Sequence, residues 1–353
     1  MCAATLIRPR ITSVRPLAAI SGGRVTVRGT GIGGEPGRLP EVGFGEVTAR
    51  VVYGDRDTVT CCVPAGIDGG ATPISLSTAP GETAFIEIGT PVATGLHQVD
   101  SPAFGDDGIL YLTHSGTRGA SSPVSIFRVG TDGFCEPFVT GLTNPTSLAF
   151  QPGGRLFVSS RFDGTVSAVD ADGRVEEVAT DLGVACGLAF DADGTLHVGD
   201  RSGTVFRVTQ SGEVSPFATL PPSVAAFHLA MAPTGVLYVA APTLATLDAI
   251  YRIDQDGTVS TVTRCFGRPQ GMAFDAHGAL HVVEALAGAS GLYRLRNSGD
   301  PGDADETDVE LVVAAPTLVG VAFDGSGAAA VVSEDIAYRF NRLPPPAACG
   351  QVR

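Results

Sequence analysis

The chain has 353 residues and a formal net charge of −14, which argues against a nucleic-acid backbone or an anionic membrane surface as a partner. All 23 basic residues are arginine, so no lysine can form a Schiff base or act as a general base. The 46 glycines and 24 prolines, without a long amphipathic helical pattern, favour an all-β protein. No apolar stretch is long enough to cross a membrane, so we expect no insertion into one.

The seven cysteines indicate a reduced environment. Their number is odd and none forms a C-x-x-C pair, so the pattern favours neither a disulfide framework nor a zinc site. The chain also starts without an apolar run of signal-peptide length. We therefore expect a cytoplasmic protein, and a place at the periphery of a membrane complex is left open.

Residues 1–90 predict a small immunoglobulin-like β-sandwich, because short alternating segments are separated by Pro and Gly-Gly turns. The segment opens with Pro9-Arg10-Ile11-Thr12-Ser13-Val14-Arg15-Pro16, followed by Gly22-Gly23 and an alternating strand. This opening resembles that of IPT/TIG immunoglobulin-like domains. The resemblance implies an interaction or spacer module.

Residues 91–343 contain a six-fold repeat with copies spaced roughly 40 to 49 residues apart. Each copy has an apolar anchor and, four residues later, a glycine. The anchors are Phe104, Phe150, Phe190, Met231, Phe274 and Phe323. Most copies also carry an apolar-aromatic-Arg-apolar segment, such as Val205-Phe206-Arg207-Val208.

One repeat is expected to form a four-stranded antiparallel meander, with an Asp-Gly turn such as Asp193-Gly194 between the first two strands. Units of this length and pattern predict the blades of a six-bladed β-propeller around a central channel. The last repeat lacks a fourth strand before the proline-rich tail at 344–353, so residues 91–96 are expected to supply it. The acidic stretch at 300–308 is expected to be a solvated loop.

The repeats resemble the NHL group and, more specifically, the SMP-30 gluconolactonase family. That resemblance implies a divalent cation in the channel, Ca²⁺ or another metal, held by an acidic residue of an opening motif and by residues that precede inner-strand glycines. The opening motif here is Asp100-Ser101-Pro102-Ala103-Phe104, in which Asp100 could replace the acidic residue of the family. The later positions depart from the family pattern, since Phe227-His228 stands where Asn-Gly is expected and Gln270-Gly271 where Asp-Gly is expected. The candidate metal ligands are Asp100, His228 and Gln270. One carboxylate with an imidazole and an amide is a poor cage for a hard cation, so no cofactor is expected.

The starts of the inner strands supply the candidate ligand-binding residues: Asp100, Thr146, His228 and Gln270. Further polar residues follow the second strands and are expected at the rim of the channel: Ser160, Arg161, Asp200, Arg201, Glu284 and Glu334. No residue is assigned a catalytic role.

These patterns favour a non-catalytic interaction or scaffold protein, a peripheral subunit of a larger assembly with protein partners on the propeller face and the IPT/TIG-like domain. The alternative is a metal-dependent lactone hydrolase with a degenerate metal site. A third hypothesis is a small-ligand binder that uses the mouth of the channel.

Overall fold

The computed structural model describes residues 8–345 except 35–36, 287, 289 and 296–308. Within that part of the chain every regular element is a β-strand, and no helix could span a membrane. The acidic stretch at 300–308 and all but the first two residues of the proline-rich tail lie outside the described residues. Two compact units can be separated. Unit 1 comprises Met1–Pro91, Leu311–Pro316 and Leu343–Arg353, and unit 2 comprises Val92–Glu310 and Thr317–Arg342.

The strands of unit 1 form one core. They are β1 (Arg10–Arg15), β2 (Ala18–Ala19), β3 (Arg24–Thr30), β4 (Val42–Phe44), β5 (Val47–Gly54), β6 (Thr58–Cys62), β7 (Gly70–Leu76) and β8 (Ala84–Ile88). They are hydrogen-bonded in the order β1-β3-β6-β5-β4-β7-β8-β2, antiparallel except for the β8–β2 pair. Alternate residues such as Val25, Val27 and Ile74 are fully buried, as expected for strands with one face on a core.

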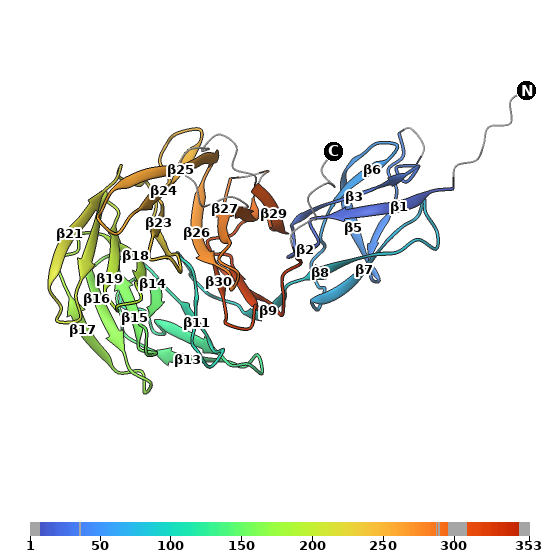
Figure 1. Ribbon diagram of the computed structural model, residues 1–353. Helices are drawn as coiled ribbons and strands as arrows, with labels where there is room; N and C mark the ends of the chain where they lie inside the picture. The colour runs from blue at the N-terminus through green and yellow to red at the C-terminus, as the bar shows by residue number, and fades with distance from the viewer. Residues whose placement is uncertain (1–7, 35–36, 287, 289, 296–308, 346–353) are drawn as a thin grey trace, which may run out of the picture. The chain divides into compact units, whose positions relative to one another are not determined.

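Five separate four-stranded sheets lie in the propeller region (Figure 1). The first sheet consists of β10 (Ala103–Phe104), β11 (Leu110–Thr113), β12 (Ile126–Val129) and β13 (Cys135–Val139). The second consists of β14 (Pro145–Phe150), β15 (Leu156–Ser160), β16 (Thr165–Val169) and β17 (Val175–Ala179). The third consists of β18 (Ala185–Phe190), β19 (Leu196–Asp200), β20 (Thr204–Val208) and β21 (Val214–Thr219). The fourth consists of β22 (His228–Met231), β23 (Leu237–Ala240), β24 (Asp248–Ile253) and β25 (Val259–Phe266).

The fifth separate sheet contains the closing strand expected from the sequence. Its order is β30 (Gly320–Phe323), β31 (Ala329–Val332), β32 (Ala337–Phe340) and β9 (Thr90–Ala93). The fourth strand of the last repeat therefore comes from the start of the region, although β9 is shorter than the expected segment 91–96.

The sequence predicted six separate blades, and here the structure differs. The remaining repeat supplies β26 (Pro269–Phe274), β27 (Leu280–Glu284), β28 (Gly291–Leu295) and β29 (Val309–Ala314), but these strands belong to a twelve-stranded sheet. The reason is that β29 has a second neighbour, since Ala18 and Ala19 of β2 pair in parallel with Val313 and Ala314. A two-residue pairing of this kind has no sequence signature.

The first strands of the repeats line the channel. They contact one another in turn, β10 with β14, then β18, β22, β26 and β30, and β30 contacts β10 again. Glycines allow this close approach: the Gly187 N–H donates to the Phe227 carbonyl at 2.7 Å, and a Cβ on Gly187 would lie 2.3 Å from that oxygen. The circuit of inner strands is a β-propeller arrangement.

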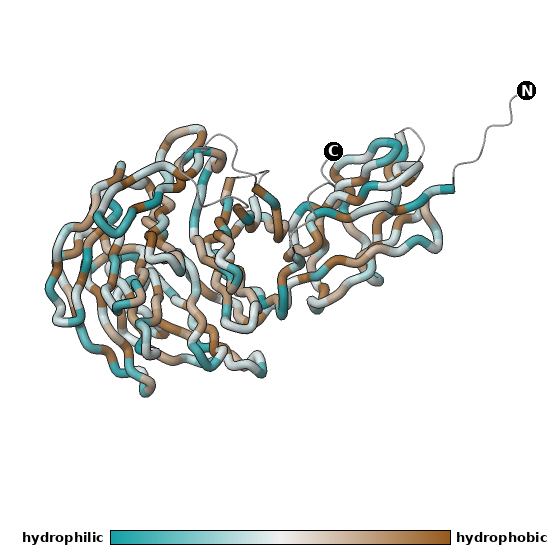
Figure 2. Tube along the Cα trace, viewed as in Figure 1, coloured by the Kyte–Doolittle hydropathy of each residue, from teal (hydrophilic) through white to brown (hydrophobic). Residues whose placement is uncertain are grey.

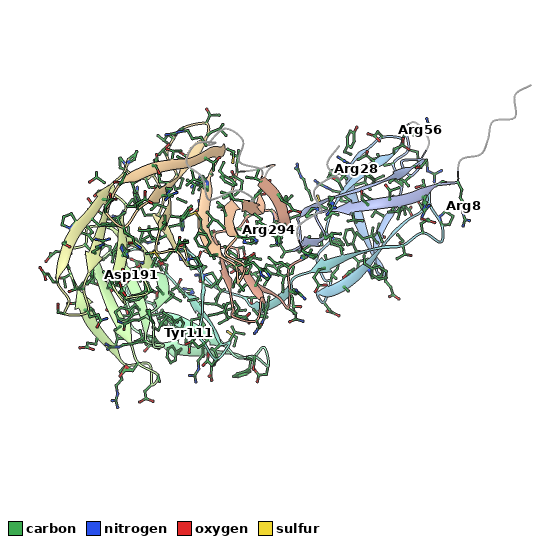
Figure 3. All side chains as sticks on the ribbon, viewed as in Figure 1. Arg8, Arg28, Arg56, Tyr111, Asp191 and Arg294 are labelled. Carbon is green, nitrogen blue, oxygen red and sulfur yellow. The ribbon has the colours of Figure 1, made fainter. Side chains whose placement is uncertain are left out.

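The hairpin turns follow the expected Asp-Gly pattern. Asp191, labelled in Figure 3, accepts hydrogen bonds from the backbone N–H groups of Asp193 and Thr195 through Oδ1 at 3.0 and 2.9 Å. Gly194 supplies the positive φ of 80° that the turn requires. Figure 2 shows hydrophobic and hydrophilic residues mixed along the chain, and several second strands of the repeats, such as β15 and β19, are buried at every position.

Candidate functional site

Three of the predicted site residues meet in the channel. His228 begins β22, Gln270 is the second residue of β26, and Asp100 precedes β10. The His228 ring joins the other two: its Nδ1 lies 2.6 Å from Asp100 Oδ1, and its Nε2 lies 3.1 Å from Gln270 Oε1. All three side chains are buried, with exposed fractions of 0% for His228, 3% for Asp100 and 8% for Gln270. We call these residues the channel triad.

Backbone and side-chain groups hold the acidic end of the channel triad. Asp100 Oδ1 also accepts a hydrogen bond from the backbone N–H of Ser101 at 2.7 Å. Gln98 Nε2 donates to the Asp100 carbonyl at 2.8 Å, while Gln98 Oε1 accepts from the Thr113 N–H at 2.8 Å. The position of Asp100 is therefore fixed from several directions.

The fourth predicted ligand residue, Thr146, serves the local backbone. It is fully buried, and its hydroxyl donates to the Asn144 carbonyl at 2.9 Å. Its own carbonyl accepts a hydrogen bond from Thr113 Oγ1 at 3.4 Å. These contacts give Thr146 a role in holding β14 to the neighbouring sheet.

The channel triad does not fit a hard divalent cation. Among the described residues no group of three or more His, Cys, Asp and Glu side chains is placed to hold a metal ion. The triad offers one carboxylate and one imidazole, and these two groups bond to each other. A hard cation requires several oxygen ligands, usually with more than one carboxylate. No step of the chemistry is therefore derived through a metal.

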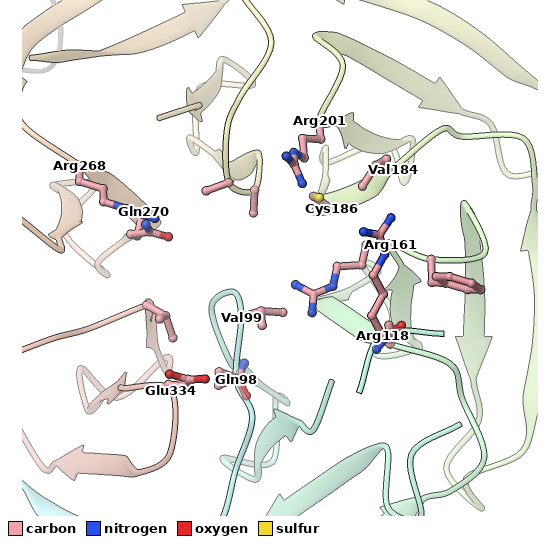
Figure 4. A pocket seen from close by; sticks show the side chains of 15 residues that line it. Gln98, Val99, Arg118, Arg161, Val184, Cys186, Arg201, Arg268, Gln270 and Glu334 are labelled. Atoms are coloured by element: carbon pink, nitrogen blue, oxygen red, sulfur yellow. The ribbon is translucent and has the colours of Figure 1, made fainter. Parts of the chain in front are cut away.

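A cavity of about 390 Å³ borders the channel triad at Gln270, and Figure 4 shows the side chains that line it. We call it the mouth cavity. Its polar lining consists of Gln98, Arg118, Asn144, Arg161, Arg201, Arg268, Gln270 and Glu334. Its apolar lining consists of Val99, Phe162, Val184, Ala225, Ala226 and Val319, with Cys186 beside them. Gln270 belongs to both the triad and the cavity wall.

Of the rim residues expected from the sequence, Arg161, Arg201 and Glu334 line the mouth cavity. Glu284 does not, because it is buried and its carboxylate accepts hydrogen bonds from the backbone N–H groups of Gly267 at 2.6 Å and Arg268 at 2.9 Å. Glu284 therefore fixes the loop that carries Arg268 and is not available to a ligand.

Asp200 has the equivalent position at the end of β19. Its Oδ1 accepts from the backbone N–H groups of Val184 at 2.8 Å and of Ser202, the residue after Arg201, at 3.2 Å. The Asp200 carboxylate therefore fixes the adjoining loops through backbone hydrogen bonds, and the next residue, Arg201, lines the cavity. Two further arginines of the cavity were not predicted from the sequence: Arg118, in the long loop between β11 and β12 of one sheet, and Arg268, in the short connection between β25 and β26.

The positive charges of the mouth-cavity arginines are not neutralised by ion pairs with the acidic side chains of the described residues, although the Glu334 carboxylate lines the same cavity. Within the described residues, no Asp or Glu forms an ion pair with Arg118, Arg161, Arg201 or Arg268. The Arg201 Nε donates to the Ser223 carbonyl at 3.2 Å. Partial burial lowers the pKa of Arg161, and the positive charges of Arg118 and Arg201 lower it further. A bound anion would relieve this repulsion.

Cys186 lies in the wall of the mouth cavity but is a poor nucleophile. Its side chain is 1% exposed, and burial raises the pKa of the thiol to about 11. A neutral, buried thiol is inert.

No protein-family model and no curated protein matches the chain. Solved structures do match its fold. One is a gluconolactonase from Xanthomonas campestris, at 14% identity and a TM-score of 0.57, covering 86% of this chain and 98% of that one. Another is a streptogramin B lyase, at 16% identity and a TM-score of 0.52, and the match covers 78% of this chain and 90% of that one. A third is an auxiliary nutrient binding protein from Bacteroides thetaiotaomicron, at 13% identity and a TM-score of 0.53, and the match covers 95% of this chain and 98% of that one. At these identities the likeness shows the β-propeller fold alone.

Proposed function

We propose that this protein is a non-catalytic binding protein that takes a small organic anion in the mouth cavity of its propeller. The observation that carries the proposal is the set of four arginines around one cavity, none of them ion-paired with an Asp or Glu side chain among the described residues. In a chain of net charge −14 this concentration of positive charge is local. Arginine binds carboxylate and phosphate groups through two parallel hydrogen bonds.

The channel triad supports binding rather than catalysis. Both ring nitrogens of His228 face acceptor oxygens, those of Asp100 and Gln270. A general base needs a nitrogen within hydrogen-bond reach of the substrate, and neither ring nitrogen is free for that role. We assign the triad the task of closing the floor of the mouth cavity.

The arginines give the first test. Replacing Arg161 by glutamine should weaken the binding of succinate or inorganic phosphate about tenfold or more, because a charge-assisted hydrogen bond is lost. The measurement is isothermal titration calorimetry of the full chain. Arg264→Gln is the matched control, since Arg264 is exposed and lies outside the cavity. Failure of both anions to bind the wild-type protein would overturn the proposal.

Lactone hydrolysis is the second candidate. The observation in its favour is the buried carboxylate–imidazole pair of Asp100 and His228 next to a cavity, in a fold shared with a gluconolactonase. A lactone-opening assay with metal analysis of the purified protein separates the candidates. Hydrolysis that Asp100→Ala abolishes, in a protein that still folds, would favour the enzyme.

The role in a larger assembly remains a prediction, as do a protein partner and a cytoplasmic location. It is tested by the size at which the native protein elutes from a gentle lysate. Elution in a large complex supports the assembly role, and elution near the 36.0 kDa of the single chain opposes it.

We also propose that β26–β29 count as the sixth blade and that unit 1 is an IPT/TIG-like module. The first point is supported by the position of β26, which contacts β22 on one side and β30 on the other. The second is supported by the single core that the strands of unit 1 share.

A further inference from the structure

The positive charge of the mouth cavity is divided between two places. Figure 4 shows Arg118, Arg161 and Arg201 together on one side of the opening, with Arg268 and Gln270 on another. An acidic group that binds among Arg118, Arg161 and Arg201 cannot also contact Arg268 on the other side of the opening. The arrangement therefore has room for a second acidic group.

The second place is built as firmly as the first. Glu284 holds the backbone N–H of Arg268 at 2.9 Å and the N–H of Leu286 at 2.7 Å. Beside Arg268, the Gln270 side chain is fixed by its contact with His228 Nε2 at 3.1 Å. Arg268 is exposed, so its guanidinium is accessible to a ligand. The fixed backbone limits the number of positions from which the Arg268 side chain can reach a ligand.

The cavity lining also contains apolar side chains. They are those of Val99, Val184, Ala225, Ala226 and Val319, and Figure 4 shows Val99 between Gln270 and the three arginines. The volume of about 390 Å³ falls at the lower end of the range of small-molecule sites. A short hydrocarbon segment can pack against these apolar side chains without leaving polar groups unpaired.

We infer that the ligand is a small organic dianion, with one acidic group among Arg118, Arg161 and Arg201 and the other at Arg268. A short apolar chain joins the two groups across the cavity. This inference rests on the proposed function and goes beyond it by naming the ligand class. Because the two contacts belong to one molecule, the second forms at high effective concentration.

The test compares diacids with monoacids of the same chain length by isothermal titration calorimetry of the full chain. The pairs are succinate with butanoate, glutarate with pentanoate and adipate with hexanoate. At least one diacid should bind about tenfold to a hundredfold tighter than its monoacid. Arg268→Gln should remove most of that advantage by weakening the diacid much more than the monoacid, while Arg161→Gln should weaken both members. Arg264→Gln, outside the cavity, should change neither.

The outcomes separate the two claims. Equal affinities for every diacid and its monoacid would overturn the inference and leave the anion site standing. Equal weakening of both by Arg268→Gln would also overturn it, because Arg268 would then serve the first acidic group. Failure of every acid to bind would overturn the proposed function and the inference together.

Discussion

Replacing Asp100 by alanine is expected to lower the free energy of unfolding of the propeller by about 3–5 kcal/mol. The variant leaves His228, which is fully buried, without its 2.6 Å partner. It also removes the acceptor of the Ser101 N–H. Breaking a buried pair from one side is costly because the remaining polar group cannot reach water. Urea denaturation followed through the transition of the propeller measures the effect.

Two variants make that result specific. Asp106→Ala removes an exposed carboxylate six residues along the chain and should change stability by less than about 0.5 kcal/mol. Asp100→Asn keeps an acceptor oxygen for His228. Its loss of unfolding free energy should therefore lie between the losses of Asp100→Ala and Asp106→Ala. A loss below about 1 kcal/mol for Asp100→Ala would contradict the assignment of the channel triad as a structural element.

Acidification from pH 7 to pH 4 is expected to destabilise the propeller through two buried histidines. Arg207 Nε donates to His197 Nε2 at 3.3 Å, and Arg294 Nε donates to His281 Nε2 at 3.1 Å. Burial lowers the pKa of each imidazole to about 4, from 6.5. The neutral ring is therefore the folded form, and protonation would place a second positive charge beside an arginine.

The sign of the effect follows from the lowered pKa. Above pH 6.5 both histidines are neutral in the folded and unfolded chains, so their full contribution is present. Below pH 6.5 the unfolded chain binds protons first, and stability falls as the pH approaches 4. The difference between 6.5 and about 4 corresponds to roughly 3 kcal/mol per histidine.

A substitution isolates this contribution from that of the carboxylates. His281→Gln retains an acceptor for Arg294 but cannot be protonated, so its loss of stability between pH 7 and pH 4 should be smaller than that of the wild type. The control is His277→Gln, because His277 is exposed and four residues away. Parallel pH profiles for the wild type and His281→Gln would rule out His281 as a source of the pH dependence.

Local repetition made much of the propeller predictable. The anchor residues, the Asp-Gly turns and the missing last strand all have signals within about 40 residues of sequence, and β9 completes the last sheet beside β32. The pairing of β2 with β29 was not predictable, because two alanines that join a parallel partner almost 300 residues away leave no pattern.

The site residues that stand at repeated positions of the sequence could be predicted. Asp100 and Gln270 stand four residues before the anchors of their repeats and His228 stands three residues before its own, and the ring brings these starts of inner strands together. Arg161 and Arg201 follow equivalent second strands and also reach the cavity. Arg118 and Arg268 come from loops of irregular length, so their convergence depends on tertiary structure that no periodicity encodes.

The arginines of the mouth cavity form the anion site of the proposed function, and a crystal structure of the protein grown with selenate would locate a bound anion. Selenate is a tetrahedral dianion, and its selenium atom is identified by anomalous scattering. We expect a selenium peak within hydrogen-bond distance of the guanidinium groups of Arg161 and at least one of Arg118 and Arg201, and none there in the Arg161→Gln variant. Ordered selenate only elsewhere on the surface, with the mouth cavity unliganded and free of lattice contacts, would contradict the proposed anion site.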